Sequence, residues 1–127
     1  MALKLKIITA STRPGRIGPI ISNWTAEQAN AHGKFDVEIV DLDAFDLPML
    51  DEPNHPAMQD YQHEHTKKWS AAIGDADAFI FVTPEYNYFP PAAIVNGIQA
   101  LVLEWARKPA GVVSYGGISG GMRGAQE

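Results

Sequence analysis

The chain has 127 residues, enough for one domain that buries roughly two thirds of its unfolded surface. Its 10 Lys and Arg residues against 15 Asp and Glu residues give a net charge of −5, which argues against nucleic acid as the main partner. Because the chain has no cysteine, disulfides, thiolate nucleophiles and thiolate-bound metals are excluded, and a cytoplasmic location is expected.

The first eight residues are apolar but are interrupted by Lys4 and Lys6. This interruption argues against a signal peptide or a membrane span, so no membrane association is expected. We predict instead a first strand from Leu3 to Thr9.

A segment rich in glycine and proline, residues 10–19, follows this strand. A helix is predicted from about Pro19 to Ala31, because proline suits the first turn of a helix. Its apolar side is expected to consist of Ile17, Ile20, Ile21 and Trp24.

The next region alternates apolar and charged residues from Phe35 to Leu42, which predicts a strand near the sheet edge. The proline-rich and acidic segment from Asp43 to Pro56 reads as a long surface loop. Apolar residues from Tyr61 to Ile73 then predict a helix that lies over the sheet.

A buried strand is predicted from Ala78 to Val82, before Pro84. The next helix is predicted from one apolar face and is expected to end at Lys108-Pro109; the face comprises Ile94, Ile98, Leu101, Val102 and Trp105. A fourth strand follows from Ala110 to Tyr115. The three tryptophans are expected in the core.

Strand and helix alternate four times, which predicts a single α/β domain over residues 1–127. We expect a doubly wound parallel sheet in three layers, with helices on both faces. In such sheets the loops at the carboxyl ends of the strands bind ligands.

The first of these loops carries hydroxyl groups and arginines in front of a helix, at Ser11, Thr12, Arg13, Arg16 and Gly18. Free N–H groups at a helix amino terminus favour phosphate, and arginine can bind phosphate oxygens in pairs. The loop lacks both the P-loop and the dinucleotide-binding pattern. The alternative is that the arginines are ordinary solvated charges on a turn.

Two further loops suit a flat ligand. The segment Tyr86-Asn87-Tyr88 offers aromatic surfaces and donors, and Ser114 to Gly124 contains five glycines that let a backbone approach closely. Each segment could instead be an exposed turn without a ligand. Together with the first loop, they predict a site for a mononucleotide with a planar ring.

Three motifs resemble those of the NADPH-dependent FMN reductase family, the flavodoxin-like group that includes azo-dye, quinone and chromate reductases. They are Ser11 to Gly18, Thr83 to Asn87 together with Pro91-Ala92 and Asn96, and Ser114 to Gly117. The resemblance covers essentially the whole chain, in order and at comparable spacing.

The resemblance implies how each motif meets the cofactor. Ser11 and Arg13 match phosphate-binding positions, and Arg16 and Gly18 stand where other members often carry polar contacts. The segment Pro84, Glu85, Tyr86 and Asn87 matches the border of the isoalloxazine ring, largely through main-chain groups. Ser114, Tyr115, Gly116 and Gly117 match the loop near the pyrimidine end.

The resemblance further implies an FMN-dependent oxidoreductase. It would take a hydride from NADPH or NADH and pass electrons to a quinone, an azo compound or a flavin, as a homodimer or homotetramer without an essential acid or base. Phe89 and the pair Ile94-Val95 depart from the family pattern. Two alternatives remain, a flavodoxin-type electron carrier and a binding module for another phosphorylated ligand.

A metal site and a hydrolase triad are not expected. His63 and His65 are two residues apart and should point to different sides of a helix, so solvated histidines are expected. No serine lies in a Gly-x-Ser-x-Gly setting.

The family continues beyond the fourth strand with further helix and strand. We therefore expect the last strand and helix to be lacking here, which leaves the apolar fourth strand at the sheet edge. Either these residues are a shortened version of a longer protein, or partner chains cover this edge. Made alone, the chain is expected to be marginally stable, oligomeric or prone to aggregation.

Overall fold

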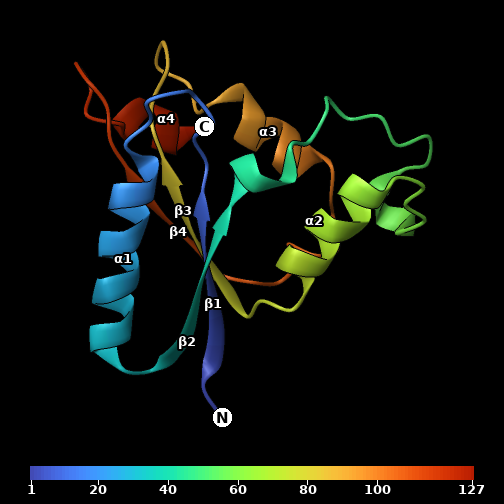
Figure 1. The fold of residues 1–127 in the computed structure, drawn as a ribbon, viewed down its shortest axis with the longest axis horizontal. Helices are drawn as coiled ribbons and strands as arrows, with labels where there is room; N and C mark the ends of the chain where they lie inside the picture. Colours follow the sequence, from blue (N-terminus) through green and yellow to red (C-terminus); the bar gives the residue numbers. More distant parts are fainter.

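The computed structural model describes residues 1–127 and contains a four-stranded parallel sheet with the order β2-β1-β3-β4 (Figure 1). The strands are β1 (Leu3–Thr9), β2 (Phe35–Asp41), β3 (Ala78–Thr83) and β4 (Ala110–Ser114). The helices are α1 (Gly18–His32), α2 (Glu64–Gly74), α3 (Ala92–Gln99) and α4 (Met122–Gln126), with the short 3-10 turns η1 (Leu42–Phe45) and η2 (Pro56–Met58). The predicted α/β alternation is confirmed.

The register of the sheet brings the strand ends to one edge. Thr9, at the end of β1, pairs with Asp41 of β2 and Val82 of β3. Thr83 in turn pairs with Ser114, the last residue of β4. All four loops that follow these strands therefore start at the same edge of the sheet.

Helices cover both faces of the sheet, as predicted. Figure 1 shows α1 on one side of the strands and α2 and α3 on the other. Beneath α1, the buried residues are Leu5, Ile7 and Val82. On the opposite face, the fully buried Trp69 and Ile73 of α2 belong to the larger core cluster.

The packed face of α1 differs from the predicted one. Ile20 and Trp24 are 70% and 54% exposed, so the expectation that Trp24 lies in the core is wrong. The helix packs through smaller side chains such as the fully buried Ser22, whose Oγ lies 2.6 Å from Thr9 Oγ1. Small residues bring α1 close to the sheet; of the predicted apolar face, Ile21 packs against the core, whereas Ile20 and Trp24 lie on the outer side.

Helix α3 is shorter than predicted. It ends at Gln99, and turns replace helix before Lys108. The reason is tertiary: the carboxylate of Glu104 turns inward and accepts hydrogen bonds from the hydroxyls of Tyr61 and Ser70, both at 2.7 Å. This contact is incompatible with the outward position that a continued helix would give Glu104.

Strand β4 forms one edge of the sheet, as predicted, and Val112 on it is 49% exposed. A cavity of about 290 Å³ lies beside it, lined in part by Phe81, Ile94 and Ile98. No helix in the structure has both the length and the apolar composition needed to cross a membrane.

Candidate functional site

The amino terminus of α1 follows the loop after β1, and only backbone groups cap it: the Ile17 carbonyl oxygen accepts the N–H groups of Ile20 and Ile21 at 3.0 and 3.3 Å. Ile17, in the N-cap position, makes no side-chain cap, and the first turn holds no acidic residue. In the loop, the N–H groups of Thr12, Arg13 and Gly15 donate to no protein acceptor. Free N–H groups at the positive end of a helix make a binding place for an anion.

Ser11 is the buried hydroxyl of this loop. It is 1% exposed, and its Oγ makes no hydrogen bond of ordinary geometry within the protein. The hydroxyl packs directly against Gly18, where any Cβ would collide with it and would also lie 3.0 Å from the Tyr115 hydroxyl. Glycine is therefore required at position 18, and Ser11 has hydrogen-bonding capacity left for a ligand.

The two arginines of the loop have different surroundings. Arg16 donates from both Nη groups to the Asp41 carboxylate at 2.8 and 2.7 Å, and from Nη1 to the Ser11 carbonyl oxygen at 2.7 Å. Arg13 is exposed, forms no ion pair and lies with its guanidinium carbon 5.9 Å from the centre of the Tyr86 ring. Arg13 is thus free for an anion, whereas a phosphate contact of Arg16 stays a prediction.

Thr12 is the second hydroxyl residue of the loop. It lines a small cavity of about 190 Å³ together with Asp43 and Asp46. Two carboxylates disfavour an anion in that cavity. Whether Thr12 reaches a phosphate stays a prediction.

The loop after β3 is a tight turn. The N–H and C=O groups of Tyr86 and Phe89 exchange hydrogen bonds at 2.8 and 3.0 Å, and the central residues Asn87 and Tyr88 have φ angles of 51° and 68°. Two central residues with positive φ define a type I′-like turn. Tyr86 and Tyr88 are exposed on it, which fits a surface for a ring better than a core contact.

The loop after β4 is anchored at both ends to the loop after β3. At its start, Tyr115 donates its N–H to the Thr83 carbonyl oxygen at 3.2 Å. Just beyond it, in the first turn of α4, Gly124 donates its N–H to the Glu85 carboxylate at 2.9 Å. The N–H groups of Gly116 and Gly117 donate to no protein acceptor.

The structure therefore brings the three predicted loops together. Arg13 of the first loop lies beside the Tyr86 ring of the second loop, and the Tyr115 hydroxyl of the third loop lies close to Gly18 of the first motif. Glu85 of the second loop accepts a hydrogen bond from Gly124 of the third motif. Burial of the Tyr115 side chain raises the pKa of its phenol, so this hydroxyl stays protonated at neutral pH and can donate a hydrogen bond.

Sequence reasoning missed two residues of this region, Asp41 and Ser119. Asp41 holds Arg16, and Ser119 donates its hydroxyl to Glu85. The position of Asp41 could have indicated it, because a carboxylate at the end of an edge strand lies beside the neighbouring loop. For Ser119, inside a run of glycines, the sequence holds no comparable signal.

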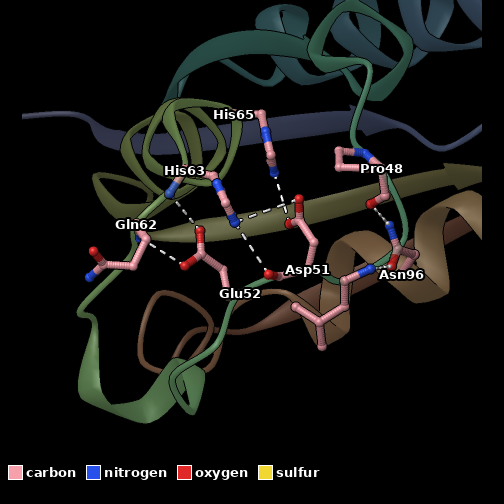
Figure 2. A network of polar contacts seen from close by, with 8 residues as sticks. Pro48, Asp51, Glu52, Gln62, His63, His65 and Asn96 are labelled. Atoms are coloured by element: carbon pink, nitrogen blue, oxygen red, sulfur yellow. Dashed lines mark hydrogen bonds and ion pairs between the residues drawn. The ribbon is translucent and has the colours of Figure 1, made fainter.

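The histidines near α2 do not point apart as expected. Their rings stack with centroids 5.1 Å apart, because His63 precedes the helix in an extended conformation. Figure 2 shows both rings directed at Asp51, whose Oδ1 lies 2.9 Å from His65 Nε2.

Asp51, Glu52 and His63 place possible ligand atoms within 4.8 Å of one another. The two oxygens of Glu52 also accept the N–H groups of Gln62 and His63 at 2.7 and 3.0 Å (Figure 2). These bonds give the cluster a structural role in the loop before α2. The expectation that it holds no metal stays a prediction.

Comparison with known proteins agrees with this geometry. The profile of the NADPH-dependent FMN reductase family matches residues 3–127. An NAD(P)H-dependent FMN reductase of Schizosaccharomyces pombe is 44% identical over 120 residues, which cover 93% of this chain and 60% of the relative. A 2-hydroxy-1,4-benzoquinone reductase of Burkholderia sp. is 30% identical, covering 98% of this chain and 61% of the relative. The chain thus spans about 60% of the length of these relatives.

Solved structures show the same fold. The flavoenzyme NAD(P)H:(acceptor) oxidoreductase FerB from Paracoccus denitrificans superposes with a TM-score of 0.72 at 24% identity, covering 98% of this chain and 68% of FerB. RosB with a bound flavin phosphate intermediate gives a TM-score of 0.76 at 18% identity, covering 98% and 56%. The fold is flavodoxin-like, and the profile match over nearly the whole chain shows that the protein belongs to the NADPH-dependent FMN reductase family.

Proposed function

We propose that the protein binds FMN at the carboxyl edge of its sheet and acts as an NAD(P)H-dependent reductase. The observation that carries this proposal is the meeting of three loops, one suited to an anion, one aromatic and one rich in glycine. FMN has the matching parts, a phosphate and a flat ring.

The first loop fits the phosphate. The buried, unbonded Ser11 hydroxyl, the free N–H groups and the unpaired Arg13 supply donors and positive charge at one place. Arg16 is already bonded to Asp41, so its part is to hold the loop in shape. Contacts from Thr12 and Gly18 to the cofactor are proposed on the family resemblance alone.

The other two loops fit the ring. Pro84 to Asn87 and Ser114 to Gly117 would border it, mainly through main-chain groups such as the free N–H groups of Gly116 and Gly117. When bound, FMN supplies the chemistry, accepting a hydride from NADPH or NADH and releasing electrons to an acceptor. The chain supplies position and electrostatics, and no catalytic acid or base is needed.

A small molecule is the proposed acceptor. One relative is named as a benzoquinone reductase and one structural neighbour as an NAD(P)H:(acceptor) oxidoreductase. Quinones, azo compounds and free flavin form the candidate class. We propose a cytoplasmic location, with neither nucleic acid nor membrane as partner.

A homodimer or homotetramer is part of the proposal. Three exposed apolar side chains, Val95, Ile98 and Val112, lie around the 290 Å³ cavity next to β4, and apolar surface of this kind favours association. Light scattering across a concentration series should show a dimer or a larger assembly. A monomer at every concentration would contradict this part.

Flavin titration tests the binding site itself. FMN should bind with one molecule per chain, and its fluorescence should be quenched on binding. Riboflavin should bind more weakly because it lacks the phosphate. If FMN and riboflavin bind equally, the phosphate assignment fails. If neither binds, the proposed function fails.

A further inference from the structure

Glu85 links the aromatic turn to the glycine-rich loop. It lies two residues after the end of β3, and its carboxylate accepts a hydrogen bond from the Ser119 hydroxyl through one oxygen and from the Gly124 N–H through the other, the latter at 2.9 Å. Both donors belong to the segment after β4. Glu85 is 34 residues from Ser119 and 39 residues from Gly124 in sequence, so one side chain ties the loop after β3 to the loop after β4 and to the first turn of α4.

The glycines of the loop make room for this side chain. A Cβ added at Gly116 would lie 3.2 Å from Glu85 Cβ and 3.1 Å from the Gly121 nitrogen, which is tighter than ordinary contact. A Cβ at Gly124 would lie 3.5 Å from Glu85 Cβ and Cγ. Glu85 thus lies between two glycines, which explains part of the glycine content in terms of packing.

The contacts require an ionised carboxylate, which accepts hydrogen bonds at both oxygens. The Ser119 hydroxyl, and after it the Gly124 N–H, hold the pKa of Glu85 below its ordinary value. Glu85 is therefore ionised at neutral pH, and both contacts persist there.

We infer that Glu85 is a positioning residue: its side chain fixes the segment Ser114–Gly124 against the aromatic turn and so places the free N–H groups of Gly116 and Gly117 for the flavin ring. This inference rests on the proposed function. The Tyr115–Thr83 hydrogen bond anchors the start of the loop. At its far end Glu85 bonds Ser119 and Gly124, beside a second contact in which the Arg123 guanidinium carbon lies 5.5 Å from the centre of the Tyr88 ring.

The first experiment measures hydrogen exchange of the amides in residues 114–124 of the flavin-free protein. Glu85→Ala should speed this exchange on the order of tenfold by releasing the loop, with a smaller effect for Ser119→Ala, which keeps the Gly124 contact. Glu27→Ala, which removes an exposed carboxylate from α1, is the matched control and should change nothing. Unchanged exchange in Glu85→Ala would overturn the inference.

The second experiment separates ring contacts from phosphate contacts. Glu85→Ala should weaken FMN and riboflavin by the same factor, because only ring contacts depend on the glycine-rich loop. Arg13→Ala should weaken FMN alone. Unchanged flavin affinity in Glu85→Ala, with faster exchange, would show a purely structural contact and overturn the positioning role.

The two failures are distinguishable. A wild-type protein that binds no flavin refutes the proposed function, and the positioning role falls with it. A wild-type protein that binds flavin, beside a folded Glu85→Ala variant of equal affinity, refutes the positioning role alone. Thermal melting of each variant confirms folding, and Ser119→Ala repeats the flavin comparison if Glu85→Ala does not fold.

Discussion

Asp41 at the end of β2 accepts hydrogen bonds from both Nη groups of Arg16, at 2.8 and 2.7 Å. This paired contact crosses from the edge strand to the loop after β1. The same guanidinium donates to the Ser11 carbonyl oxygen at 2.7 Å, so Arg16 fixes the loop to the edge strand. The two arginines of the loop therefore have separate tasks, with Arg16 shaping it and Arg13 available to a ligand.

Replacing Arg13 tests that division. Arg13→Ala should weaken FMN binding by about 1.5–3 kcal/mol, the scale of a hydrogen bond to a charged group. Riboflavin affinity should not change, because riboflavin has no phosphate. Lys68→Ala removes an exposed cation from α2 and serves as the charge control. Equal losses for the two flavins would refute the assignment.

The Arg16–Asp41 pair predicts a pH-dependent stability. The Arg16 guanidinium holds the pKa of Asp41 below its ordinary value. A carboxyl with a lowered folded-state pKa stabilises the protein above its unfolded value of about 4, and this contribution disappears as the pH falls through the lowered pKa.

Asp41→Asn should therefore lower the free energy of unfolding at pH 7 by about 1 kcal/mol, because water screens a pair of which Asp41 is partly exposed. The difference from wild type should shrink as the pH drops below about 4. Urea unfolding at pH 7 and at a pH below about 4 checks this. The control is Asp36→Asn, which removes an exposed carboxylate from the same strand. A difference that is constant with pH would contradict the ion pair.

The aromatic turn predicts a contrast between two changes at Asn87. Its positive φ suits glycine and strains a β-branched residue. Asn87→Gly should keep the turn, and flavin affinity with it, since the proposed contacts are main-chain ones. Asn87→Val should distort the turn and weaken flavin binding more than it lowers the melting temperature. Equal flavin affinity in both variants would count against a ring-binding turn.

Replacing Glu104, a residue far from the candidate site, is expected to lower the stability of the protein strongly. It is 4% exposed and accepts hydrogen bonds from Tyr61, Ser70 and Gln59. Glu104→Ala should lower the free energy of unfolding by about 2–4 kcal/mol, because the donors lose a buried, charged acceptor. Chemical denaturation measures this, and a loss under about 0.5 kcal/mol, typical of surface substitutions, would show that the contacts are not stabilising.

The sequence was sufficient for the sheet and for the placing of the three loops. The apolar residues Leu5, Ile7 and Ile8 identify β1, and parallel topology then requires the following loops to share an edge. Arg13 and the Tyr86–Asn87 turn lie at that edge as expected. Their contacts with FMN stay predictions.

The misjudged features depend on tertiary contacts that local patterns do not contain. Helix α3 ends early because Glu104 accepts hydrogen bonds from Ser70 of α2 and from Tyr61 in the loop before α2. Trp24 lies outside because Ser22 occupies the close contact with β1. The histidine rings stack because His63 lies before the first turn of α2 in an extended conformation, so helical periodicity does not give the direction of its side chain.

Anaerobic addition of NADPH to the FMN-loaded protein tests the central claim most directly. We expect NADPH alone to bleach the oxidised flavin absorption and a quinone to restore it. A flavin that binds tightly but stays oxidised with both NADPH and NADH would contradict reductase activity and would support a flavodoxin-type electron carrier instead.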